Sequence, residues 1–252
     1  VGYLSLPSAS DDADWRAYEV LAPAAPLAPL LLSPASGAAV DRSQPVTLAI
    51  GHQSASGLTL TAVRVPIRVA GGTWGSLKSD GTIAAGDTSQ VITTSSGTVT
   101  IAAGVLTANT SYEWYAYSQD SAGWSPASAT STLVARVVPT ATVTLTTASG
   151  DLSPTVTATI TPGSGTVRSY ALRISPAADG TSDGYLWESG QIATTATGIS
   201  VELPAAQLGT LWTNGASYRV WLLPVDTALP GVWTASAPAT VSWTPPTAPS
   251  GI

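Results

Sequence analysis

The chain has 252 residues, a length that suits two domains of ordinary size. Charged residues make up only 10% of it, the formal net charge is −6, and eight arginines stand beside one lysine, so no basic stripe exists to neutralise nucleic-acid phosphates. Because cysteine is absent, disulfides, thiolate catalysis and most structural zinc sites are excluded. Low charge with 23 glycines, 19 prolines and ample Val, Leu, Trp and Tyr predicts a folded, turn-rich, all-β chain without a nucleic-acid partner.

Residues 1–28 differ from the rest of the chain. They contain possible strands at "GYLSL" and "WRAYEVL" around an acidic turn, and we expect an N-terminal arm or the end of an upstream domain, which could add strands to a neighbouring subunit. The apolar stretch "VLAPAAPLAPLLL" is broken by three prolines and is too short to span a bilayer, so no membrane insertion is predicted. Because the sequence opens on Val1 and lacks methionine, we expect a processed or partial chain.

From about Leu30 onward, short β-branched or aromatic stretches with period two alternate with Gly, Pro, Ser, Asp and Asn clusters, as strands and turns do. No window shows a helical stripe. Strands are predicted near 46–50, 58–70, 91–94, 98–102, 111–118 and 128–136. A second set is predicted near 141–147, 154–161, 167–175, 185–188, 198–203, 216–223 and 235–243.

The two sets of strands are copies of one pattern. Tyr112 in "LTANTSYEWYAY" corresponds to Tyr218 in "LWTNGASYRVWLL", and Trp124 corresponds to Trp233. This repeat predicts two tandem β-sandwich domains, residues 29–136 and 137–245, followed by an extended linker at 246–252.

The stretch "LTANTSYEWYA" resembles the tyrosine corner and F strand of fibronectin type III domains, in which a Leu and a polar turn precede a Tyr. The resemblance implies that the Tyr112 and Tyr218 hydroxyls bond to backbone a few residues upstream, with Leu211 taking the place of Leu106. The early strands lack the usual core Trp of that family, so Leu48 or Ile50, and Val156 or Ile160, must fill the space.

Alternation along the two F strands places one set of aromatic side chains outside the core. Tyr115, Tyr117 and Trp221 are predicted on exposed faces, and we favour a contact with another domain, a subunit or a ligand for these three residues. Trp124 and Trp233 lie where the F strand turns into the G strand. We favour a structural role for this pair, covering the open end of each sandwich, and a place on the same contact surface is the alternative.

No constellation in the sequence predicts catalysis or a cofactor. His52 is the only histidine, and "IGHQSASG" lacks a nucleophile-elbow pattern, so a loop or strand-end role is favoured over a Ser-His-Asp triad. The four Glu residues (Glu19, Glu113, Glu188 and Glu202) show no spacing that would place two in one cleft. The acidic loops "SDDADWR" and "ADGTSDG" do not complete a calcium-loop pattern and are read as turns.

The segments "LLLSPASGAAVDRSQPVTLAI" and "TSYEWYAYSQDSAGWSPAS" resemble fibronectin-like modules in the minor tail proteins of actinobacterial bacteriophages. The resemblance implies a non-enzymatic tail or tail-tip component located in the virion, without a cofactor. Its partners would be other virion proteins, copies of itself and a host cell-wall glycan. The alternatives are a spacer or carbohydrate-binding region of a secreted polysaccharide-degrading enzyme, and a capsid or tail-tube decoration protein.

Overall fold

The computed structural model of the chain describes residues 22–147, 154–203, 212–213 and 215–241. These residues form strands and no helix, so the all-β prediction is confirmed. It follows that the described part of the chain contains no helix able to cross a membrane. The predicted linker at 246–252 and most of the predicted arm lie outside the described residues, although the last two arm residues belong to the first strand.

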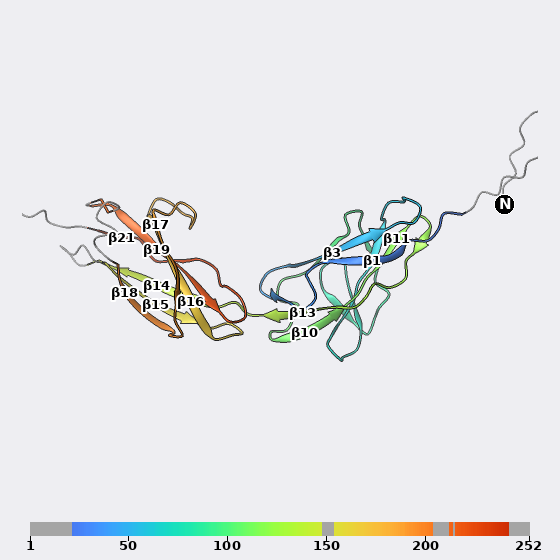
Figure 1. Cartoon of the computed structure of the whole chain (residues 1–252), viewed down its shortest axis with the longest axis horizontal. Coiled ribbons are helices and arrows are strands. Elements are labelled where there is room, and N and C mark those ends of the chain that lie inside the picture. Colours follow the sequence, from blue (N-terminus) through green and yellow to red (C-terminus); the bar gives the residue numbers. More distant parts are fainter. Residues whose placement is uncertain (1–21, 148–153, 204–211, 214, 242–252) are drawn as a thin grey trace, which may run out of the picture. The chain divides into compact units, whose positions relative to one another are not determined.

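The strands before residue 137 make three sheets, whose hydrogen-bonded orders are β1-β3-β9, β2-β13-β10-β5-β6-β7 and β12-β11-β4-β8 (Figure 1). Their bounds are β1 Leu27–Ser33, β2 Ala38–Asp41, β3 Val46–Gln53, β4 Ala62–Arg64, β5 Pro66–Val69, β6 Gly75–Leu77, β7 Ile83–Ala85, β8 Ile92–Thr93, β9 Thr98–Ile101, β10 Thr110–Trp114, β11 Tyr117–Asp120, β12 Gly123–Trp124 and β13 Ser131–Arg136.

The strands after residue 139 make two sheets, ordered β14-β15-β18 and β17-β16-β19-β20, with β21 also paired to β19. Their bounds are β14 Thr140–Thr146, β15 Thr155–Thr161, β16 Val167–Pro176, β17 Trp187–Ala193, β18 Gly198–Glu202, β19 Ser217–Asp226, β20 Thr234–Ala235 and β21 Ala239–Thr240. A single hydrophobic core contains side chains of both sheets, among them Val156 of β15 and Leu172 of β16. This arrangement is a β-sandwich.

The described residues fall into two compact units. The first unit comprises residues 22–36, 47–102 and 112–132, and the second unit comprises the described residues of 37–46, 103–111 and 133–241. The domain boundaries drawn from the sequence, 29–136 and 137–245, stay a prediction.

Three strands predicted as continuous are each split in the structure, and one of them is 235–243, whose described part holds the end of β20 and all of β21. The stretch 58–70 divides at Val65 into β4 and β5, and 111–118 divides after Trp114 into β10 and β11. The break in these two stretches has a local cause. The Pro66 carbonyl accepts from Tyr115 N at 3.2 Å, but Pro66 has no N–H with which to donate at this point of the ladder. Five short strands were not predicted (β1, β2, β6, β7 and β12), since most are two to four residues long and show no alternation.

The predicted alternation along both F strands matches the observed burial. Each inward side chain is at most 5% exposed and each outward neighbour is partly exposed. The core space expected to lack a Trp is filled as predicted by aliphatic side chains. The inward F-strand residues are Tyr112, Trp114, Ala116, Tyr218, Val220 and Leu222, and the aliphatic residues are Leu48, Ile50, Val156 and Ile160.

Candidate functional site

The two corner tyrosines are buried core residues. The Tyr218 hydroxyl accepts a hydrogen bond from the Thr213 backbone N–H at 2.7 Å, which is the contact that the corner predicts. Trp212, 6% exposed, packs edge-on against the Tyr218 ring at 4.4 Å. Trp212 precedes Tyr218 by the same number of residues as Leu106 precedes Tyr112, so Trp212, and not Leu211, takes the place of Leu106.

The outward side chains of the first unit form a row of aromatic rings and arginines, here called the aromatic row. Trp74 meets Tyr115 edge-on at 4.7 Å, and Tyr115 meets Tyr117 at 5.6 Å. Tyr117 is paired across the sheet with Arg64, whose guanidinium lies 4.2 Å above the Trp124 ring. These contacts join strands β11, β4 and β12 on one face.

The Trp74 end of the aromatic row is closed by an ion pair. The Arg68 guanidinium lies 4.2 Å above the Trp74 ring and donates from Nε to Glu113 Oε2 at 2.6 Å. Arg68 and Glu113 are opposite each other in the β5–β10 register, so the sheet itself positions this pair. Glu113 therefore neutralises an arginine and is not a free general acid or base.

A pocket of about 290 Å³ opens in the aromatic row at its Trp124 end. Burial raises the pKa of the Tyr115 phenol above its usual value, and the adjacent Tyr117 hydroxyl raises it further, so the Tyr115 ring enters the pocket as a neutral group near pH 7. The pocket is lined by Arg64, Thr88, Tyr115, Tyr117, Trp124 and Ser125. It combines apolar ring faces with a cation and hydroxyl groups, which is the composition of a site that binds a polar small molecule.

The second unit repeats the arginine–tryptophan pair. Trp233 follows Arg173 by the same number of residues as Trp124 follows Arg64, and the Arg173 guanidinium lies 4.3 Å from the Trp233 ring. Each Trp therefore contacts an arginine on the strand beyond the one that the short strand at that Trp pairs with, a partner that the sequence analysis did not identify. The equal spacing of the two pairs was the available signal.

The predicted contact residue Trp221 is engaged within the second unit. Its indole N–H donates to Ser175 Oγ at 2.8 Å across the β16–β19 pair, and its side chain is partly exposed. The same face holds the Arg173 cluster, in which Tyr185 contributes a second ring, 4.3 Å from the guanidinium. These contacts tie β16 to β19 and to the 182–188 segment.

His52 does take part in a Ser-His-Asp set. His52 Nδ1 lies 3.0 Å from Ser118 Oγ, and His52 Nε2 lies 3.4 Å from Asp120 Oδ2. Ser118 is fully buried and Asp120 is 3% exposed, so no substrate carbonyl could approach the hydroxyl. The set ties the end of β3 to β11, in agreement with the strand-end role favoured from the sequence.

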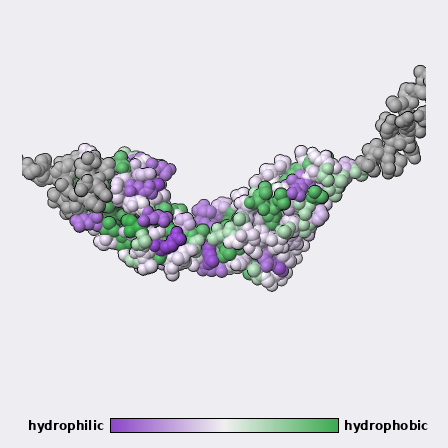
Figure 2. Space-filling view, viewed as in Figure 1, coloured by the Kyte–Doolittle hydropathy of each residue, from purple (hydrophilic) through white to green (hydrophobic). Residues whose placement is uncertain are grey.

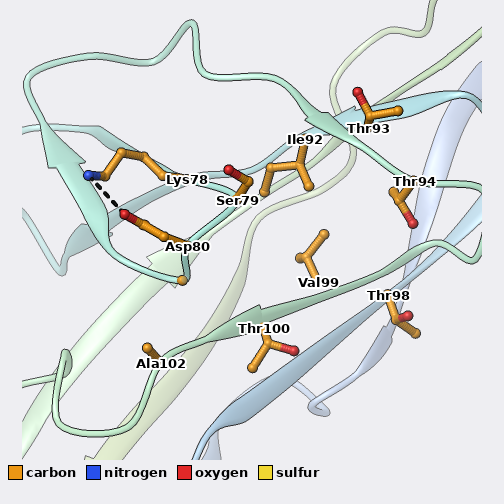
Figure 3. Close-up of a pocket in the computed structure, with 11 residues that line it drawn as sticks. Lys78, Ser79, Asp80, Ile92, Thr93, Thr94, Thr98, Val99, Thr100 and Ala102 are labelled. Carbon is orange, nitrogen blue, oxygen red and sulfur yellow. Dashed lines mark ion pairs between the residues drawn. The ribbon is translucent and has the colours of Figure 1, made fainter.

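A second pocket of the first unit, of about 310 Å³, lies between the 78–81 turn and strands β8 and β9. Figure 3 shows its threonine side chains, Thr93, Thr94, Thr98 and Thr100, and the Lys78–Asp80 ion pair at 3.5 Å. Asp80 is mostly exposed, and no aromatic ring lines this pocket. It therefore offers hydroxyl and methyl groups to a ligand but no ring face.

The described residues contain no group of three or more His, Asp or Glu side chains that could hold a metal ion. Glu188 pairs with Arg173 at 3.4 Å, and Glu202 is exposed on β18. In the loop "ADGTSDG", Asp179 accepts from Thr181 and Asp183 lies 3.6 Å from Arg173, while the loop "SDDADWR" lies outside the described residues.

Comparisons with known proteins do not identify a family for this chain. No family model matches the chain, and no curated protein is significantly similar in sequence. Solved structures similar to it include the chicken CNTN1 FN1–FN3 domains (15% identity, TM-score 0.45, covering 87% of this chain and 66% of that one). Fibronectin(III)-like modules of Clostridium thermocellum CbhA are also similar (14% identity, TM-score 0.41, covering 85% and 94%). The all-β assignment of the described residues rests on their own sheets and core.

Proposed function

We propose that this chain is a non-enzymatic structural and adhesion component of a bacteriophage virion, a tail or tail-tip protein. In this proposal its β-sandwiches serve assembly with other virion proteins and attachment to a host cell-wall glycan. The observation that carries the attachment role is the aromatic row of the first unit, with its pocket at Trp124. The virion setting comes from the resemblance of the sequence to minor tail proteins.

The geometry of the aromatic row supports a binding role. Aromatic rings bury a large area at small entropic cost, and rings held by neighbours are already oriented before a ligand arrives. Trp74, Tyr115 and Tyr117 hold one another through edge contacts, and Trp124 is held by Arg64. A contact surface of this kind is preorganised, and weak single contacts become strong when many copies meet one cell surface.

The assembly role is supported by a separate apolar surface. Leu27, Leu30 and Leu32 of β1 are 58%, 53% and 62% exposed. Figure 2 shows a hydrophobic patch over β1 and β3. Because β1 is at the edge of its sheet, this patch combines exposed side chains with an open strand edge, as subunit contacts do.

The attachment role can be tested by cosedimentation with purified actinobacterial cell walls. The chain is displayed in many copies on a particle, and the double variant Tyr115→Ser, Tyr117→Ser is compared with it. We expect the variant to lose at least about tenfold in binding, which corresponds to about 1.4 kcal/mol, while it melts as a folded protein. Val232→Ser is the matched control, since it removes an apolar side chain that is 60% exposed in the second unit.

Equal binding by the double variant would contradict the attachment role. Retention of the wild-type chain on cellulose instead of cell walls would favour a module of a polysaccharide-degrading enzyme. A chain that binds neither surface but forms a defined oligomer through β1 would favour a decoration protein.

A further inference from the structure

The two arginine–tryptophan pairs differ in how their charge is balanced. In the second unit, Arg173 lies 3.4 Å from Glu188 and 3.6 Å from Asp183, and it donates to the Ser182 carbonyl at 3.2 Å. Two carboxylates thus neutralise this guanidinium within the chain.

In the first unit, Arg64 has no such partner. Within the described residues no carboxylate lies in ion-pair distance of its guanidinium, and its Nε is buried without a hydrogen-bond partner. The guanidinium of Arg64 instead makes a cation–π contact with the Trp124 ring. Arg68, four residues further along the chain, is already paired with Glu113. Arg64 is therefore an unneutralised cation, and it lines the pocket at Trp124.

The other polar groups near the pocket form no ion pair or hydrogen bond with Arg64 among the described residues. Asp87, next to the lining residue Thr88, accepts from the backbone N–H and hydroxyl of Ser89 and from Gln90, and these bonds lower its pKa to about 2. The Ser125 hydroxyl accepts from Ser118 N and donates to the Pro126 carbonyl. Asp87 is therefore ionised at neutral pH but makes no ion pair with Arg64, and Ser125 carries no charge, so an anionic ligand would supply the partner that Arg64 lacks.

We infer that this pocket binds a carboxylate-bearing sugar residue, with Arg64 as the carboxylate-binding group. A guanidinium presents parallel N–H donors that match the two oxygens of a carboxylate. The rings of Tyr117 and Trp124 offer apolar faces to the C–H groups of a sugar ring, and Thr88 offers a hydroxyl. The volume of about 290 Å³ is near the lower end for small-ligand sites, which suits one sugar unit better than a protein segment. The inference rests on the proposed function, because it names the ligand class of the same surface.

The test uses two sugars that differ only at C6, the methyl β-glycosides of glucuronic acid and glucose, titrated into the full chain. Binding is followed by NMR at the indole N–H and backbone amide signals of the pocket residues. We expect glucuronate to bind at least about tenfold more tightly, since a hydrogen bond to a charged group is among the stronger ones in proteins. Arg64→Gln should remove this preference, and Arg64→Lys should keep part of it.

Lys78→Gln is the matched control, because it removes one positive charge from the same unit at the other pocket and should leave the preference unchanged. Thermal melting of each variant establishes that it is folded. Equal binding of the two sugars, or an unchanged preference in Arg64→Gln, would overturn the inference. Binding of an acidic peptide in place of glucuronate would overturn it as well and would point to a protein partner.

The outcomes separate this inference from the attachment role. If neutral cell-wall sugars bind at the aromatic row and Tyr115→Ser, Tyr117→Ser abolishes that binding, the attachment role stands and the assignment of Arg64 fails. If no sugar binds the chain, both fail.

Discussion

Asp226 at the end of β19 offers the sharpest test of how the second unit is held together. Its carboxylate is 3% exposed and accepts four backbone N–H groups. Oδ1 accepts from Ala228 at 2.7 Å and Leu229 at 2.8 Å, and Oδ2 accepts from Gly163 at 3.2 Å and Gly165 at 3.1 Å. One side chain thus fixes two loops at one end of the sandwich.

Replacement by asparagine isolates the contribution of these bonds because it preserves the shape. The single amide oxygen of Asp226→Asn can serve one pair of donors, and the amide nitrogen then faces the other pair. A buried donor that loses its acceptor costs about 1–3 kcal/mol, so two of them cost about 2–6 kcal/mol. Because both loops lie near the surface, where water can reach freed donors, we expect a loss of about 3 kcal/mol in the free energy of unfolding.

The measurement is urea unfolding of the full chain, together with hydrogen exchange of the Ala228 and Leu229 amides as a local readout. Asp183→Asn is the control, since the Asp183 side chain is 91% exposed and the change should stay within about 0.5 kcal/mol. A loss below about 1 kcal/mol in Asp226→Asn, with exchange unchanged, would refute the reasoning that unmet backbone donors set the cost.

Three further outcomes are expected. Tyr218→Phe should cost the second unit about 1 kcal/mol or more through the lost Thr213 bond, and Tyr112→Phe a similar amount in the first; unchanged melting of both would remove the corner assignment. Gly97→Ala should destabilise clearly more than Gly104→Ala in urea, because both have positive φ but only at Gly97 would a Cβ lie 2.3 Å from the Ile50 carbonyl. Because the pKa of Tyr115 is raised in the folded chain, the contribution of its phenol to the free energy of unfolding is complete below about pH 10 and is lost as pH rises through the folded-state pKa. Tyr115→Phe should flatten this alkaline loss of stability, and an unchanged pH profile would contradict the role given to Tyr115.

The parts of the fold that follow from local pattern could be predicted from the sequence. The F strands alternate because one face is buried, so their inward residues and the outward Tyr115, Tyr117 and Trp221 were identified by period alone. The short strands β6 and β7 could not be found in this way. They are held by pairing with β5 and with each other, which the composition of three-residue segments does not encode.

The residues that complete the candidate site depend on strand register, which the sequence alone did not supply. Arg64 reaches Trp124 only because β4 pairs with β11 and β11 with β12. Asp226 reads as an ordinary turn residue, yet it lies as far from Asp120 as Tyr218 lies from Tyr112. A comparison of polar as well as aromatic positions between the two copies would have identified Arg64 and Asp226.

The divergence between the two copies bears on which unit makes contacts. The contact between arginine and tryptophan does not depend on a carboxylate, because Arg64 and Trp124 make it in the first unit without one. The carboxylates around Arg173 therefore remove a charge that would otherwise face a ligand or solvent. In a chain of net charge −6, Arg64 remains an available positive group set among aromatic rings. If the proposed ligand contact belongs to the first unit because of this asymmetry, Asp183→Asn with Glu188→Gln should give the second unit some of the same anion preference.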